Sequence, residues 1–265
     1  MDSIALQLGI LGPALLAGAL VLSTHVPLGK EVLRRGIIFL DLAIAQVAAL
    51  GLIIASMLGL EIQHEHGGEW IANLIAITAA ILAASLLYQF RHLAARTQEA
   101  LIGILFILAA TGSVLLLSKD PQGGERLREI LVGQILWVEY SDLLITALVY
   151  AGILLSWFRL RNNIGQYAFY PLFAVTITLS TQLVGVYLVF ASLIVPALAS
   201  QAASKPLLFA YLIGILGYIS GLTLSALFDF PSGAMIAWCL VAIAGIFWVV
   251  NSLTSPSTDD TSSTT

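Results

Sequence analysis

The sequence predicts an all-α, polytopic membrane protein with about eight spans. Its 265 residues are 59% hydrophobic and 10% charged, and the mean hydropathy is +0.98, which is far too apolar for a soluble domain. The apolar residues form continuous runs of about 20 residues, the length of helix that crosses a ~30 Å hydrocarbon core, and lack the alternation of barrel strands. A bundle of bilayer-spanning helices is therefore expected.

Eight apolar runs follow one another, and each is expected to form a helix. They cover residues 4–23, 37–60, 71–90, 100–118, 143–158, 172–199, 207–228 and 234–251. The run 172–199 is too long for one ordinary span and contains Gly185 and Pro196, so we expect a helix followed by a broken or re-entrant segment near 185–199. Residues 1–253 form one membrane domain, and the polar segment 254–265 has the composition of a disordered tail.

The connecting segments separate by the sign of their charge. Segments 24–36, 91–99 and 159–170 carry net charges of +2, +1 and +2, whereas 61–69 and 119–142 carry −3 and −2. The positive-inside rule places the first group in the cytoplasm and the second group outside. If the run 172–199 enters the membrane and returns, the loop that contains Lys205 is cytoplasmic as well.

One charged side chain, Asp41, interrupts the apolar runs. It lies about four residues from the basic end of its run, so its carboxylate either reaches the interface and pairs with Arg35 or faces the bundle interior as part of a cargo path. Gln46 is a candidate for the same path. Five positions place the two side chains about 140° apart on an ideal helix, so joint coordination of one ion requires distortion.

Two further polar clusters are candidates for function. The run 172–199 carries Thr176, Thr178, Ser180, Thr181 and Gln182, which suit either helix–helix hydrogen bonds or a wetted pathway wall. The segment 61–69 includes His64, Glu65 and His66, whose imidazole and carboxylate groups are either metal ligands or solvated surface.

Several functions are excluded by what the sequence lacks. It has no G-x-x-x-x-G-K-[ST] phosphate loop and no H-E-x-x-H motif. Its basic and aromatic residues do not form a nucleic-acid surface, and the single cysteine, Cys239, excludes an intrachain disulfide. We therefore expect no enzyme in this chain.

Five stretches together resemble the membrane permease subunits of zinc and manganese ABC importers. They are residues 27–35, 97–104, 131–143, 184–197 and 221–233, in the family's order. The resemblance implies a multi-pass protein of the bacterial plasma membrane that dimerises, receives a divalent metal from a periplasmic or surface-tethered binding protein, and couples to two cytoplasmic ATPase subunits. It implies no permanently bound cofactor.

The resemblance also implies a coupling helix near 197–206 that contacts the ATPase subunits. Its candidate residues are Ala197, Ser200, Ala203, Lys205 and Pro206.

The sequence departs from the family's pattern at its ligand-type positions. Leu42 and Gln46 stand where the family has an Asp and a His four residues apart, with Asp41 displaced by one position. Ile107 stands where it has a His, and Gln134 where an Asp follows the loop glycine. Neutral groups bind a bare divalent cation less well than carboxylate or imidazole. Transport of a metal complex or another small solute, and an ATP-independent transporter or channel, are therefore alternatives.

Overall fold

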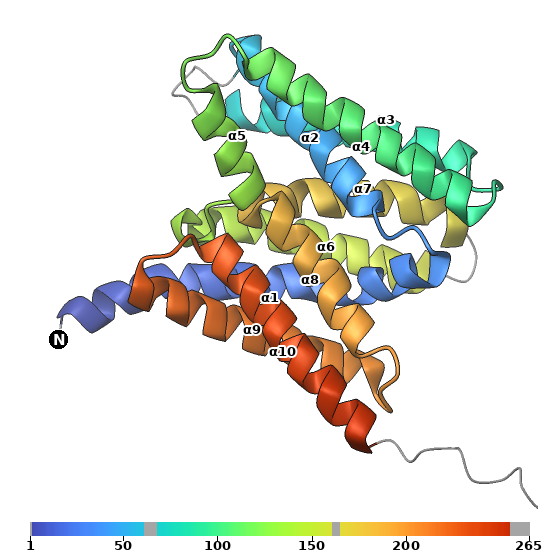
Figure 1. Ribbon diagram of the computed structural model, residues 1–265. Helices are drawn as coiled ribbons and strands as arrows, with labels where there is room; N and C mark the ends of the chain where they lie inside the picture. The colour runs from blue at the N-terminus through green and yellow to red at the C-terminus, as the bar shows by residue number, and fades with distance from the viewer. Residues whose placement is uncertain (1, 61–67, 161–164, 255–265) are drawn as a thin grey trace, which may run out of the picture.

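The computed structural model describes residues 2–60, 68–160 and 165–254. This described part is helical and contains no strand (Figure 1). Its elements are α1 (Asp2–Arg35), α2 (Leu40–Met57), α3 (Gly68–Gln89), α4 (Ala95–Leu117), α5 (Gly123–Val132), the 3₁₀ helix η1 (Ile135–Trp137), α6 (Tyr140–Leu160), α7 (Gly165–Val184), α8 (Val186–Ala199), α9 (Pro206–Phe228) and α10 (Ser232–Thr254). The predicted tail, apart from Thr254, lies outside the described residues, and its boundary stays a prediction.

The predicted runs all fall on helices. Six helices, α1 to α4, α9 and α10, are each long and apolar enough to cross a membrane, and the bent pair α7 and α8 adds a seventh candidate. Helix α6 is apolar over the shorter stretch Leu143–Arg159. The polytopic all-α class predicted from the sequence is confirmed.

Helix α1 is longer than predicted, because it continues through the basic segment 24–36 to Arg35. Glu31 accepts hydrogen bonds from Arg34 at 2.6 Å and Arg35 at 2.7 Å, and these i,i+3 and i,i+4 pairs support its last turns. The acidic segment 119–142 likewise contains α5 and η1 where the sequence indicated only a loop.

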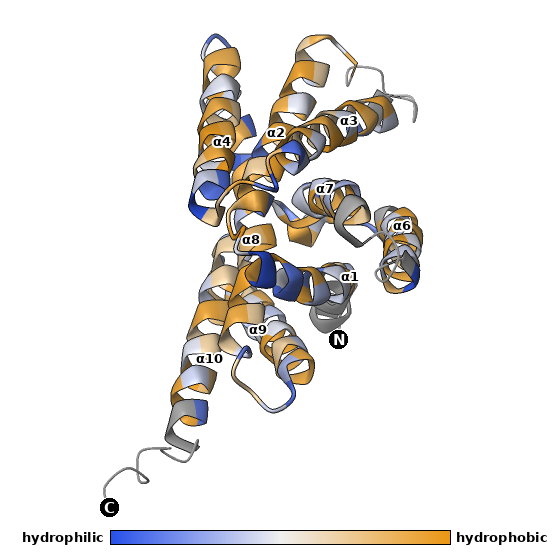
Figure 2. Cartoon of the chain, turned by 90° about the vertical axis from the view of Figure 1, so that its right-hand side faces the viewer, coloured by the Kyte–Doolittle hydropathy of each residue, from blue (hydrophilic) through white to orange (hydrophobic). Residues whose placement is uncertain are grey.

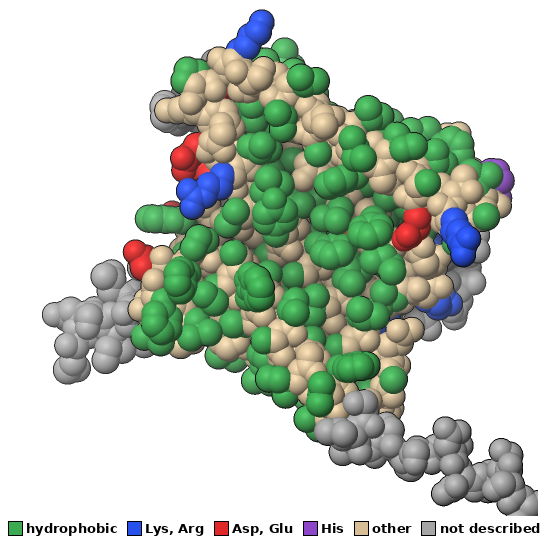
Figure 3. Space-filling model, in the orientation of Figure 1, with side chains coloured by type: hydrophobic (Ala, Val, Ile, Leu, Met, Phe, Trp, Pro, Cys, Tyr) green, Lys and Arg blue, Asp and Glu red, His purple; other side chains and the backbone are tan. Residues whose placement is uncertain are grey.

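The bundle has two ends that differ in charge. Helix α5 and the turn between α9 and α10 lie at one end, which we name the acidic end; the end of α1, the α3–α4 turn and the α8–α9 turn lie at the opposite, basic end (Figure 1). On the face drawn in Figure 3, apolar side chains cover the middle and charged side chains gather at the two margins. This distribution is expected for a helix bundle whose apolar middle lies in the lipid bilayer and whose charged ends lie in water.

Helix α8 lies in the centre of the bundle. Figure 2, viewed along the bundle, shows α2, α3 and α4 on one side of α8 and α1, α9 and α10 on the other. Helix α8 packs against α1, α7, α9 and α10, and nine of its residues are buried. A largely buried helix is expected to be apolar around most of its circumference, as this one is, and only Tyr187 and Leu198 near its two ends are strongly exposed large side chains.

The predicted break in the run 172–199 is present at Gly185. The chain bends there by 119° between helices α7 and α8. Gly185 has φ +81° and ψ 160°. That backbone region is accessible almost only to glycine. Pro196 does not interrupt the helix, because it lies within α8, which continues to Ala199. The α8–α9 turn consequently lies at the same end as the basic segments, as a re-entrant segment requires.

Candidate functional site

A polar cavity of about 400 Å³ opens at the acidic end between α2, α3, α5 and α7. Its lining comprises Leu52, Ala72, Asn73, Glu129, Ile130, Gly133, Gln134, Thr181 and Gln182. A neighbouring cavity of about 280 Å³ shares Glu129, Gly133 and Gln134 and extends to Phe230 and Ser232 beside α10. Glu129 and Gln134 therefore line both cavities and are themselves exposed.

Close backbone packing holds this cavity in shape. Gly133 ends α5 with φ +74° and ψ 169°, and a Cβ added there lies closer than 3.0 Å to the Val184 carbonyl oxygen. A Cβ on Gly185 meets the Gly133 amide nitrogen equally closely, and one on Gly233 meets the Val132 carbonyl oxygen. These three glycines, which we name the glycine junction, bring the end of α5, the α7–α8 break and the start of α10 together.

Backbone hydrogen bonds hold the chain on either side of Gly133. The Gly133 N–H donates to the Glu129 carbonyl oxygen at 2.8 Å, and the Trp137 N–H donates to the Gln134 carbonyl oxygen at 2.9 Å. On the opposite wall, the buried Gln182 Nε2 has no hydrogen-bond partner within the described residues. An unpaired amide that lines a polar cavity is a donor available to water or a ligand.

The hydroxyls predicted on α7 bond within their own helix, and Ser180 in addition contacts the Tyr150 hydroxyl of α6. Thr178 donates to the Ala174 carbonyl oxygen and Thr181 to the Ile177 carbonyl oxygen, each at 2.8 Å. Thr178 is fully buried and does not line the cavity, whereas Thr181 does and keeps its acceptor lone pairs. Of the predicted α7 residues, Thr181 and Gln182 thus reach the site.

Asp41 lies far from this cavity. Eleven positions of α2 separate it from Leu52, which is about 16 Å at the helical rise. The carboxylate is fully buried, neither oxygen has a hydrogen-bond partner among the described residues, and Arg35 pairs with Glu31. Of the two alternatives, the structure therefore places Asp41 in the bundle interior. Gln46 is also buried, six positions from Leu52 along the same helix.

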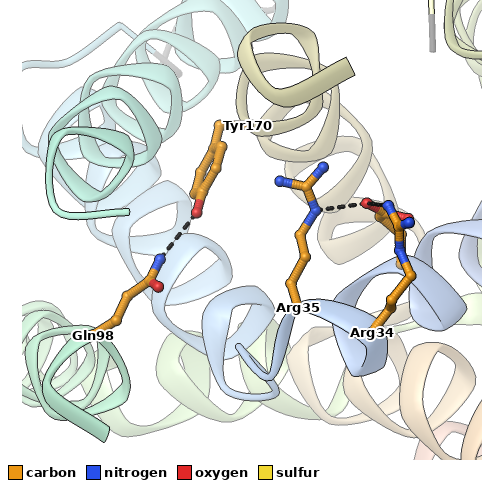
Figure 4. Close-up of polar contacts among 5 residues, drawn as sticks. Arg34, Arg35, Gln98 and Tyr170 are labelled. Carbon is orange, nitrogen blue, oxygen red and sulfur yellow. Dashed lines mark hydrogen bonds and ion pairs between the residues drawn. The ribbon is translucent and has the colours of Figure 1, made fainter. Parts of the chain in front are cut away.

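Polar contacts that the sequence did not indicate join helices at the basic end. The Gln98 Nε2 of α4 donates to the Tyr170 Oη of α7 at 3.0 Å (Figure 4). A Glu99 carboxylate oxygen accepts the Ile38 N–H at 2.9 Å, and the Arg35 guanidinium stacks over the Phe169 ring. Helices α1, α4 and α7 and the segment before α2 are thereby joined at the end opposite the cavity.

The remaining ligand-type positions that the structure describes do not form a site. His64, Glu65 and His66 lie outside the described residues. Ile107 is 58% exposed on the outer side of α4, and Leu42 packs against the core. Across residues 2–60, 68–160 and 165–254, no group of three His, Cys, Asp or Glu residues is arranged to hold a metal ion.

The segment expected to form a coupling helix is a turn. Helix α8 ends at Ala199, and Lys205 directly precedes Pro206, the first residue of α9. Ala197, Ser200 and Ala203 are buried, and the Ser200 hydroxyl donates to the Pro196 carbonyl oxygen at 2.8 Å. Lys205 is exposed and Pro206 is half-buried, so these two are the predicted contacts on the surface.

Two cavity residues, Asn73 and Glu129, were missed from the sequence. Glu129 lies in a segment with many charges, and nothing there distinguishes it from Glu125 or Glu139. Glu129 is identified only in the folded structure, where the last turn of α5 faces α7.

Comparison with known families decides the class of the protein. The sequence model of the ABC 3 transport family matches residues 7–170 and 158–251. The chain belongs to the ABC 3 transport family. This membership confirms the resemblance to zinc- and manganese-type permeases inferred from the sequence motifs.

Individual relatives of this ABC 3 family member are distant in sequence. It is 28% identical to "Manganese transport system membrane protein MntC" of Halalkalibacterium halodurans over 268 residues, which covers 91% of this chain and 88% of that protein. It is 27% identical to an uncharacterized membrane protein of Cyanophora paradoxa over 208 residues, covering 69% and 70% of the two chains.

A solved structure shares its fold. The structure titled "PsaBC from Streptococcus pneumoniae in complex with Fab" contains a chain with a TM-score of 0.71 at 21% identity, covering 93% of this chain and 95% of that one.

Proposed function

We propose that this ABC 3 family member is the membrane permease subunit of an ATP-driven importer for a divalent metal, manganese or zinc. Family membership over residues 7–251 and the relative named for manganese transport support this assignment. The observation that carries it in the structure is the open polar cavity beside the α7–α8 break, lined by Glu129, Gln134, Thr181 and Gln182.

The cavity lining suits transient contact with a metal ion. Carboxylate, amide and hydroxyl oxygens are ligands for hard divalent cations such as Mn²⁺. One carboxylate among neutral groups binds weakly, and weak binding favours passage over retention. The metal is cargo in this proposal, and no permanently bound cofactor is required.

The proposal includes the partners implied by the family. Two copies of the chain form the path in a bacterial plasma membrane, a periplasmic or surface-tethered protein delivers metal at the acidic end, and cytoplasmic ABC ATPase subunits act at the basic end. The exposed α8–α9 turn with Lys205 supports an ATPase contact there, since it follows directly from the central helix α8.

Metal uptake in a strain that lacks other importers tests the function. Cells that produce this chain with its ATPase and binding protein are expected to accumulate manganese or zinc, and the ATPase is expected to co-purify with the chain. Glu129→Gln is expected to lower the initial uptake rate several-fold at limiting metal, whereas Glu139→Gln, exposed at the same end but outside both cavities, serves as control. Uptake by the purified chain alone would instead support an ATP-independent transporter or channel.

A second candidate cargo is a metal complex. The cavity exceeds the size of a bare ion, and the described residues lack a cluster of three metal-ligating groups. Uptake of a chelated metal that is faster than uptake of the free ion at equal total metal would favour this candidate.

A further inference from the structure

Another large cavity lies at the basic end, between α1, α6 and α9 and away from the candidate site. Its volume is about 680 Å³, within the ~300–1,000 Å³ range of ligand pockets. One wall is charged and consists of Lys30, Glu31 and Arg34 in the last two turns of α1. The facing wall is apolar and consists of Trp157 and Phe158 of α6 and Leu207 of α9. The cavity thus combines a polar half and an apolar half.

We propose that this cavity binds an anionic phospholipid, with the phosphate at Lys30 and Arg34 and the upper acyl chains along Phe158 and Leu207. Basic pockets between membrane helices suit anionic headgroups, because each Lys or Arg adds attraction to the negative lipid surface. The inference depends on the chain being a membrane protein and is independent of the transported cargo.

The charged wall has donors left for a phosphate. One Glu31 carboxylate oxygen accepts from Arg34 at 2.6 Å and from Arg35 at 2.7 Å, so Lys30, Glu31, Arg34 and Arg35 together carry a net charge of +2. The Arg34 side chain is 73% exposed, and a guanidinium has five N–H donors. The half-buried Lys30 ammonium forms no hydrogen bond or ion pair with the described residues.

The apolar wall lies at the depth of the upper acyl chains. Arg34 stands at the end of the candidate span Leu11–Arg35, and Leu207 stands at the start of the span Pro206–Phe228. Phe158 is 66% exposed and Leu207 is 46% exposed, whereas Trp157 is buried behind them. Aromatic side chains are enriched at this interfacial level. A soluble phosphate would engage the charges and leave these apolar side chains uncovered.

The cavity wall is held in place by a contact between α1 and α9. Pro27 lines the cavity and has no N–H, so the Ser23 carbonyl oxygen four residues earlier loses its helical donor. The Tyr211 hydroxyl of α9 donates to that oxygen at 3.3 Å. The two helices that form the charged wall and part of the apolar wall are therefore joined where they meet.

Lipid titration of the detergent-purified full chain, measured by native mass spectrometry, tests the proposal. Phosphatidylglycerol is expected to bind at least about fivefold more tightly than phosphatidylcholine with the same acyl chains. Lys30→Gln is expected to weaken phosphatidylglycerol about fivefold, the effect of one basic residue near the lipid surface. Arg96→Gln removes an exposed charge at the same end of the bundle on α4 and is expected to leave the affinity unchanged.

Leu207→Gln separates a lipid site from a phosphate site, because it keeps the charges and makes the apolar wall polar. It is expected to weaken phosphatidylglycerol several-fold, and inorganic phosphate is not expected to compete. Equal affinity for the two lipids, or equal effects of Lys30→Gln and Arg96→Gln, would overturn the proposal. Full competition by inorganic phosphate would also overturn it. A Lys30→Gln variant that keeps its lipid selectivity but no longer co-purifies with the ATPase subunit would overturn it as well, because that result assigns the surface to a partner protein.

Discussion

Replacing Gly133 with alanine tests whether the glycine junction holds the candidate cavity together. Gly133 has φ +74° and ψ 169°, a region that costs an L-residue about 1–3 kcal/mol. The added Cβ also lies closer than 3.0 Å to the carbonyl group of Val184, and backbone atoms cannot rotate away as a flexible side chain does. Such overpacking adds about 1–3 kcal/mol. Gly133→Ala is therefore expected to destabilise the protein by about 2–6 kcal/mol.

The assay can use the only cysteine of the chain. Cys239 is buried in α10, so a thiol-reactive dye reports its exposure as the purified protein is heated in detergent. At ~2–4 °C per kcal/mol for a chain of about this size, the expected fall in melting temperature is about 4–24 °C.

Two matched variants separate the contributions to this loss. Gly36 has φ +69° with nothing within 4 Å of an added Cβ, so Gly36→Ala isolates backbone strain. Gly103→Ala, in open space on α4 with helical φ, lacks both strain and clash and is expected to be neutral or slightly stabilising. A Gly133→Ala melting temperature within 2 °C of that of Gly36→Ala would refute the close packing argued for the junction.

Two further predictions concern the path and its coupling. Asp41→Asn replaces a buried carboxyl group, which lacks a hydrogen-bond partner among the described residues and whose ionisation in this apolar site is unfavourable, with a neutral amide. It is expected to raise the melting temperature while lowering manganese uptake at limiting metal; wild-type uptake would remove Asp41 from the proposed path. Lys205→Glu reverses an exposed charge in the α8–α9 turn and is expected to lower cargo-stimulated ATPase activity of the reconstituted complex more than Arg96→Glu does. Equal activity of these two variants would contradict a specific contact at Lys205.

The sequence was informative wherever a local pattern determines structure. Continuous apolar runs predicted the helices, and one over-long run with Gly185 predicted the bent pair. The extension of α1 to Arg35 was missed because charged residues in a predicted loop hide the ion pairs that Glu31 makes within a helix. Residues 200–205 form a short turn between α8 and α9 and not the expected helix, and the contact of this segment with an ATPase stays a prediction.

The candidate site depended more on contacts between distant segments. Thr181 and Gln182 were predicted from polarity near a break, and both line the cavity. Their partners Asn73 and Glu129 come from helices far away in the sequence, and each looks like an ordinary interfacial residue until α3, α5 and α7 are packed together. The sequence distinguished Gln134 only as a departure from the family's pattern, although it lines both cavities.

The positions of the polar groups impose a condition on any transport cycle. The described conformation has its polar cavity at the acidic end, whereas contacts such as Gln98 with Tyr170 join the helices at the basic end. Between the cavity and Asp41 lie about 16 Å of buried α2, with Gln46 the polar side chain between them. A cation cannot cross that distance unless water or polar protein groups replace its hydration shell. In the proposed path through Asp41, passage therefore requires helices to separate along α2, and we expect the movement in α7, which packs against α2 and ends at the glycine junction.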